Sequence, residues 1–228
     1  LAAERIDRPQ HGEGKADATL ERWQTTLKDV KRVFAALAEI DWQGEAVRRD
    51  AVDLARTALD RLLILRMKEL QLGYDGWTSG RVGSDGLCER ADELVFLAEK
   101  MADILELHTD YSLWESFERL NRIEKVVNPN FPQILLENAT CGYCRSHQYE
   151  AARYLYLPRA RAFARAVRDM VAHVKGGGII PDERKTLGLD GSSDLINLLY
   201  AMPLEHYRPK RPRTSERFQA LMRELACR

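Results

Sequence analysis

Two cysteines separated by two residues form the most conspicuous chemical motif in the sequence. They are Cys141 and Cys144, and His147 follows three residues later. A C-x-x-C pair can be a redox dithiol or half of a zinc site, but the redox role requires a preceding strand, and no strand is predicted here. A closed zinc site needs four ligands, and Cys88 or His108 would have to complete it. Without a second Cys or His pair, we expect packed thiols, no metal and no cofactor, and keep Cys141, Cys144 and His147 as weak metal candidates.

A second group combines imidazole, carboxylate and aromatic side chains at a turn between two expected helices. It consists of His108, Asp110, Tyr111 and Trp114. Aromatic faces stack on sugar rings, and carboxylates accept hydrogen bonds from hydroxyl groups, so such a cluster can bind a polar ring. The alternative for His108 is a partly buried histidine near a helix C-terminus. No second carboxylate at a known separation allows us to assign a glycosidase pair.

Other catalytic and phosphate-binding motifs are absent from the sequence. The glycines at 176–178 are not followed by the Lys and Ser/Thr of a phosphate loop, and neither G-x-S-x-G, H-E-x-x-H nor a Rossmann fingerprint occurs. The basic, proline-rich segment at 208–213 could contact phosphates, but we interpret it as a solvated extended linker.

The composition is that of an ordinary globular protein. The 228 residues are 45% hydrophobic and 31% charged, and 35 Lys+Arg balance 35 Asp+Glu. Zero net charge removes the simplest electrostatic case for nucleic-acid binding, and no apolar run approaches the ~20 residues of a membrane span. We therefore expect neither nucleic acid nor a membrane as partner. Four cysteines without a disulfide pattern favour a reducing cytoplasm.

Helical periodicity dominates the elements that must position these residues. Apolar residues spaced by threes and fours predict helices from about Asp17 to Asp41, from Glu45 to Leu72 with a stop at Gly73, and from Leu87 to His108. We expect these three helices to form an antiparallel bundle. The residues expected to face inward on the second helix are Val47, Ala51, Leu54, Ala58, Leu62 and Leu65.

Further helices are expected towards the C-terminus. Ser112 and Glu115 have capping-box spacing, and Pro158 either kinks a helix or opens one that ends at the glycines 176–178. The other expected helices cover Gln133–Asn138, Ser193–Met202 and Thr214–Ala226, and the helix that contains Pro158 starts at Tyr143. Since no alternating apolar pattern predicts a sheet, the fold class is all-α, an antiparallel helical bundle with additional C-terminal helices.

The organisation along the chain follows from these segments. Residues 1–16 are polar and linker-like, residues 17–176 form the bundle, and residues 177–228 carry C-terminal helices and the basic connector, packed on the same domain. The segment from Gly73 to Gly86 has five glycines in fourteen residues, which predicts a connecting loop, with a binding loop as the alternative. Its aromatic residues, Tyr74 and Trp77, have little local core to join.

The stretch from Leu107 to Phe163 resembles the helical C-terminal domain of bacterial family 20 glycoside hydrolases, which are exo-β-N-acetylhexosaminidases. The resemblance covers about a quarter of the chain in spaced fragments. The residues that carry it are Asp110, Tyr111, Ser112, Asn128, Pro129, Asn138, Tyr143, Cys144, Arg145, Tyr149 and Glu150. The Y-L-P-R sequence also resembles the helical C-terminal region of family 89 α-N-acetylglucosaminidases, the competing interpretation.

The resemblance implies a non-catalytic module. In family 20 the catalytic Asp-Glu pair lies on a (β/α)₈ barrel, which needs ~250 residues with alternating strands, so we expect no catalytic residue here. The implied partners are the catalytic barrel of the same polypeptide, a second copy in a homodimer, and an amino-sugar glycan. The substrate-cleft candidates, expected to converge near one end of the bundle, are Asp110, Tyr111, Trp114, Tyr143 and Arg145. The alternative function is a stand-alone helical protein-interaction domain.

Overall fold

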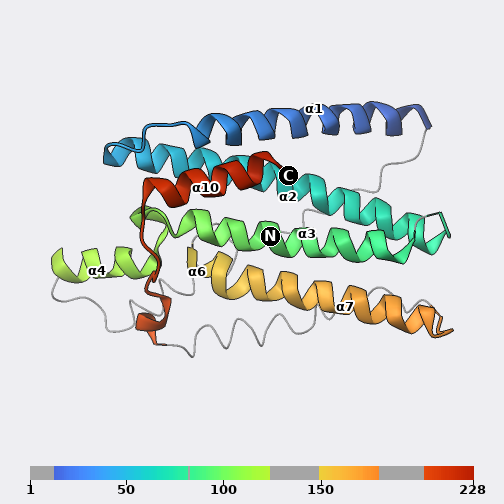
Figure 1. Ribbon diagram of the computed structural model, residues 1–228. Coiled ribbons are helices and arrows are strands. Elements are labelled where there is room, and N and C mark those ends of the chain that lie inside the picture. The colour runs from blue at the N-terminus through green and yellow to red at the C-terminus, as the bar shows by residue number, and fades with distance from the viewer. Residues whose placement is uncertain (1–12, 82, 124–148, 180–202) are drawn as a thin grey trace.

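The computed structural model describes residues 13–81, 83–123, 149–179 and 203–228, and every regular element in these ranges is helical. This confirms the all-α fold class. Four long helices lie side by side and alternate in direction (Figure 1). They are α1 (Glu13–Ala38), α2 (Glu45–Thr78), α3 (Ser84–Leu105) and α7 (Leu157–Lys175). A fifth helix, α10 (Ser215–Ala226), runs antiparallel to α1 and packs against it (Figure 1).

Short elements join the long helices. The turn η1 (Thr109–Tyr111) leads into α4 (Leu113–Ile123), and α6 (Tyr149–Ala151) continues through the π-helical turn η2 (Ala152–Tyr156) into α7. The turn η4 (Leu204–Tyr207) precedes the segment that leads to α10. Gly176 follows the last residue of α7, as predicted, and Pro158 lies in the first turn of α7, the second of the two roles expected for it. Thr214, expected as the first residue of the last helix, is instead the cap of α10.

The second helix does not stop at Gly73, so the prediction of a loop from that residue is wrong. α2 continues for another turn and a half to Thr78, and α3 begins at Ser84. The physical reason is tertiary: Tyr74 and Trp77 pack against an apolar cluster with α3 and α7, and this burial outweighs the helix penalty of glycine. The chain leaves α2 through Gly80, whose φ of +72° suits glycine.

The inward face of α2 is rotated from the predicted one. Ala51, Ala58, Leu62 and Leu65 are buried as expected, but Val47 and Leu54 are exposed. Fully buried positions that the pattern missed are Val52, Ala55 and Leu59. Small alanines on this face let a neighbouring helix approach closely, which sets the rotation of α2.

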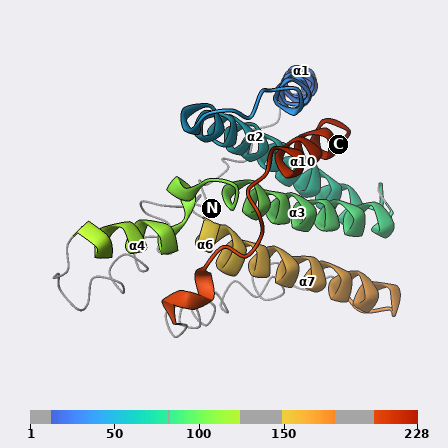
Figure 2. The ribbon, with the colours of Figure 1, turned by 60° about the vertical axis from the view of Figure 1, so that its left-hand side comes forward.

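The apolar core has two parts. The larger cluster joins α1, α2, α3 and α10, and the smaller one joins the end of α2, the start of α3 and α7. α3 therefore contributes to both, and lies between α2 and α7 (Figure 2).

A ladder of ion pairs sets the register of α3 against α7. Asp85 pairs with Lys175 at 3.1 Å, Asp92 pairs with Arg168, and Glu99 pairs with Arg161 at 3.5 Å. The partners recur every seventh residue on both helices, as two antiparallel helices in steady contact require.

Candidate functional site

The turn between α3 and α4 carries three of the five predicted cleft residues. The Asp110 carboxylate pairs with Arg49 of α2 and Arg119 of α4, each at 3.1 Å. The Tyr111 hydroxyl donates a hydrogen bond to Asp53 Oδ1 at 3.0 Å, and the half-buried Trp114 lies in the first turn of α4. These contacts hold the turn rigidly at the end of the bundle where α2 begins and α3 ends (Figure 1).

His108 lies beside this turn and outside the helix that was expected to include it. α3 ends at Leu105, and His108 has extended backbone geometry, yet its side chain is buried. Its Nδ1 atom accepts a hydrogen bond from the Asp110 backbone at 3.2 Å. Its Nε2 atom lies 3.0 Å from Glu45 Oε1 without a hydrogen-bond partner among the described residues. His108 is thus a buried structural histidine with one satisfied nitrogen.

The electrostatics of the cluster disfavour acid–base chemistry. Burial and the hydrogen bond to Asp53 raise the pKa of Tyr111 to about 12. The hydrogen bonds from Arg56 lower the pKa of Asp53 below its usual value, with a further contribution from Tyr111. At neutral pH Tyr111 is therefore a neutral donor and Asp53 an anion, an arrangement suited to holding a hydroxyl group or a neighbouring element.

The remaining candidates fall elsewhere. Tyr143 and Arg145, and the metal candidates Cys141, Cys144 and His147, lie outside the described residues. Convergence of the five cleft residues therefore stays a prediction. Within the described ranges no group of three or more His, Cys, Asp or Glu side chains could hold a metal ion.

The basic segment at 208–213 is not a solvated linker, because Arg211 and Arg213 pair with carboxylates at the end of α3 and in α4. The buried Glu106 accepts hydrogen bonds from Arg211 Nε at 2.6 Å and from Arg217 at 2.7 Å. Arg211 also pairs with Asp103, and Arg213 donates to Glu115 at 2.6 Å. Sequence reasoning missed this network. Its signal is a row of basic residues near the C-terminus, but the acidic partners are about a hundred residues away.

Glu150 is a second buried carboxylate. The sequence singled it out only as one of the residues that resemble the glycoside hydrolase domain. It is fully buried in α6, and its Oε1 atom accepts hydrogen bonds from the Ser112 hydroxyl and the Trp114 backbone, each at 3.2 Å. Ser112 caps the Glu115 backbone at 3.3 Å, but Glu115 pairs with Arg213 instead of completing the capping box. Glu150 therefore supplies, from another helix, the second acceptor at the start of α4.

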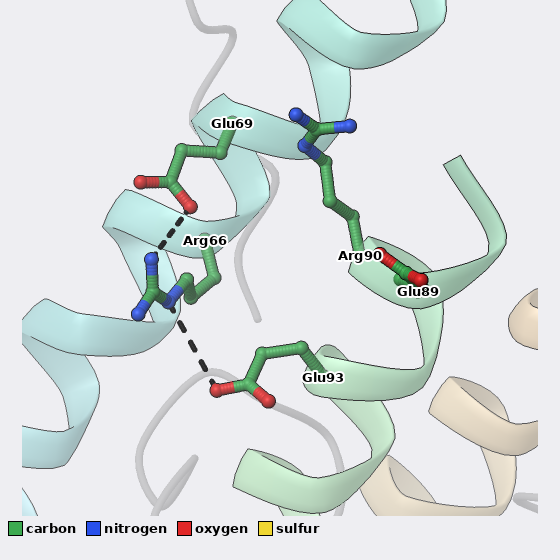
Figure 3. Close-up of a pocket in the computed structure, with 5 residues that line it drawn as sticks. All are labelled: Arg66, Glu69, Glu89, Arg90 and Glu93. Atoms are coloured by element: carbon green, nitrogen blue, oxygen red, sulfur yellow. Dashed lines mark hydrogen bonds and ion pairs between the residues drawn. The ribbon is translucent and has the colours of Figure 1, made fainter. Parts of the chain in front are cut away.

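A small cavity of about 150 Å³ lies between α2 and α3 and is lined by charged residues alone (Figure 3). Arg66 projects between two carboxylates and donates to Glu69 at 2.8 Å, and its Nε atom lies 4.0 Å from Glu93. Arg228 also donates to Glu93, at 3.1 Å. The volume is below the ~300 Å³ of typical ligand sites. Three glutamates and two arginines line the cavity, and Arg228 supplies the third positive charge. This cavity is a structural ion-pair site.

Comparison of the chain with protein-family models, with curated proteins and with solved structures gives no match. In the part of the chain that the structure describes, none of the helices is both long and apolar enough to cross a bilayer.

Proposed function

We propose that this chain is a non-catalytic helical module of a larger glycoside hydrolase of the β-N-acetylhexosaminidase type. The observation that supports this most is the fixed turn of Asp110 and Tyr111 at one end of the bundle, with the half-buried Trp114 in the first turn of the helix that follows. Aromatic rings and carboxylates in fixed positions are the groups that a sugar-binding surface needs. The proposed role is to support the catalytic barrel and form part of the rim of its substrate cleft.

The non-catalytic part of the proposal is supported by how the carboxylates near this end are used. Asp110 pairs with two arginines, Asp53 with Arg56, and Glu106 with Arg211 and Arg217. A general acid or base must be able to reach the substrate, whereas these carboxylates are engaged by arginines of the chain itself. The free thiols of Cys88 and Cys227 are consistent with the further proposal of a cytoplasmic location.

Two measurements test this function. Immunoblotting of a source-cell lysate with an antibody against this chain should show a polypeptide larger by at least the ~250 residues of a barrel. The isolated chain should not hydrolyse 4-nitrophenyl N-acetyl-β-glucosaminide, whereas the full polypeptide should. A native band near 26.1 kDa would contradict the module interpretation.

The rim role has its own test in the full polypeptide. Trp114→Ala should raise KM about tenfold with a smaller change in kcat, because a stacking surface contributes to binding more than to chemistry. The matched control is Arg165→Ala, an exposed side chain on α7. If Trp114→Ala and the control have equal KM values, Trp114 does not contact the substrate. The module would then only pack against the catalytic barrel.

A stand-alone protein-interaction domain is the second candidate. One observation favours it: the outer side of α2 carries exposed apolar side chains, as described below. A native band near 26.1 kDa would support this function over the hydrolase module.

A further inference from the structure

The exposed side of α2 carries a second apolar stripe, which lies beside the buried face of the helix. Val47, Leu54, Ile64 and Leu72 are 39%, 54%, 52% and 53% exposed. Their spacings of seven, ten and eight residues place all four within about a third of the helix circumference. α1 lies above α2 and α3 below it in Figure 2, and both helices pack against α2. We name the stripe and the charged residues between its members the α2 outer face.

The charges on the α2 outer face have no ion-pair partners in the part of the chain that is described. They are Asp50, Arg61 and Lys68, of which Asp50 and Arg61 are exposed. On the rest of α2 the arginines are paired: Arg48 with Glu45, Arg56 with Asp53, and Arg66 with Glu69. Unpaired charges interleaved with exposed apolar residues distinguish this face from an ordinary solvated one.

The order of these residues is self-complementary. Asp50 precedes Leu59 in the sequence by as many residues as Lys68 follows it. The acidic and the basic residue are therefore equidistant, along α2, from a point near Leu59. Leu54 and Ile64 are symmetric about the same point. A two-fold axis at this point would bring Asp50 opposite Lys68, and Leu54 opposite Ile64, of a second copy.

We propose that two copies of this chain associate by antiparallel pairing of their α2 outer faces. Two-fold symmetry makes every contact occur twice, so one apolar pair and one ion pair become two of each. Arg61 lies opposite Thr57 of the second copy in this register, so no like charges meet. The parallel alternative would place Asp50 against Asp50 and Arg61 against Arg61, which is repulsive. The dimer does not depend on the proposed hydrolase function.

The association is tested by sedimentation velocity on the purified chain over a range of concentrations. The wild type should show a species of about twice 26.1 kDa that dissociates on dilution. Leu54→Glu and Ile64→Glu should each weaken dimerisation at least about tenfold, because a charge then enters the apolar contact. Val33→Glu, at the exposed apolar position of α1, is the matched control and should leave the dimer unchanged. A wild type that stays monomeric at its highest soluble concentration would overturn the proposal.

The register is tested by charge reversal. Asp50→Lys and Lys68→Asp should each weaken the dimer, and the double variant should recover it, because the pair is restored with reversed sign. Asp50 is exposed and Lys68 is half-buried, and circular dichroism should show unchanged helix content in all three variants. If both single variants dimerise weakly and the double variant does not regain wild-type dimerisation, the antiparallel register is excluded.

Disulfide trapping gives an independent readout of the same register. With the four native cysteines replaced by serine, a mixture of Leu54→Cys and Ile64→Cys chains should oxidise to a covalent dimer, whereas Leu54→Cys alone should not. A covalent dimer of Leu54→Cys with itself would indicate parallel pairing and contradict the proposal.

Discussion

At the scale of single residues, two buried glutamates show how neighbours decide the behaviour of one chemical group. Burial raises the pKa of Glu106, but the hydrogen bond from Arg217 and the charge of Arg211 outweigh it, so the pKa lies below its usual value. Glu150 accepts hydrogen bonds from uncharged groups, among them the Ser112 hydroxyl and the Trp114 backbone, and burial raises its pKa to about 7. Glu106 is therefore a stable anion, whereas Glu150 changes charge near neutral pH.

Glu150 makes the stability of the fold depend on pH. Its pKa is higher in the folded chain than the usual 4.5, so the folded state binds the proton more tightly. Its contribution to stability is full below about pH 4.5, falls as the pH rises towards 7, and is lost above that value. The shift corresponds to roughly 3 kcal/mol.

We predict that Glu150→Gln removes this part of the pH dependence. Glutamine keeps an acceptor for Ser112 and Trp114 but never ionises, so the variant should gain up to roughly 3 kcal/mol on the wild type between about pH 5 and about pH 8. Urea denaturation at several pH values measures the difference. Glu39→Gln, at the exposed position directly after α1, should follow the wild-type profile. Parallel profiles for Glu150→Gln and wild type would show that Glu150 does not titrate in this range.

At the scale of elements, the junction between α2 and α3 depends on a glycine inside a helix. Gly73 is buried, and a Cβ atom at this position would lie 3.2 Å from two atoms of the Arg90 side chain. Arg90 crosses this point and donates to the Gly86 carbonyl at 2.9 Å, in the first turn of α3. Gly73 therefore provides space for the arginine that links the two helices.

We predict that the effect of Gly73→Ala depends on Arg90. In the wild-type background alanine should be neutral or destabilising, because the arginine must move away. In an Arg90→Ala background the same change should stabilise the fold by about 1 kcal/mol, the difference in helix propensity. A double-mutant cycle of thermal or urea unfolding measures the coupling. Equal effects in both backgrounds would mean that the close approach has no energetic consequence.

The α3–α7 ladder belongs to the same scale. Both charge rows are visible in the sequence at seven-residue spacing, but the sequence does not state which helices pair. Since exposed ion pairs contribute little free energy, the ladder sets the register more than the stability, which comes from the apolar residues between the two helices.

At the scale of the whole molecule, α10 closes the larger core from the far end of the chain. Phe218 is fully buried, and its ring centroid lies 4.1 Å from that of Trp42. Met222 and Leu225 join the same cluster, which also contains Val30 and Phe34 of α1. α1 and α10 thus depend on each other, although nearly the whole chain separates them.

We predict that Phe218→Ala destabilises the fold by about 3–5 kcal/mol, because it leaves a cavity among fully buried side chains. Urea denaturation monitored by tryptophan fluorescence, to which Trp42 contributes with the other three tryptophans, provides the measurement. Arg223→Ala, at an exposed position of the same helix, should change stability by less than about 0.5 kcal/mol. A small loss for Phe218→Ala would indicate that α10 is not integral to the core.

The sequence by itself determined the helices and several of their ends. Apolar spacing located α1 and α3 within a few residues, the helix expected at Thr214–Ala226 matches α10 within one residue, and Gly176 marked the end of α7 correctly. These signals are local: periodicity and capping depend on residues within a turn or two of one another. The turn at Asp110 and Tyr111 was also visible in the sequence, because its polar and aromatic residues interrupt the helical pattern.

Only the tertiary structure decided the rest. The continuation of α2 past Gly73, the rotation that exposes Leu54, and the burial of Glu106 beneath Arg211 all depend on contacts between distant parts of the chain. The free energy of burying apolar side chains in such contacts can exceed the free energy of local helix propensity. It cannot be inferred from a short segment of sequence, because the contacting residues are far apart in the chain. The same holds for Glu150, whose pKa is raised because folding removes it from water without placing a cation beside it.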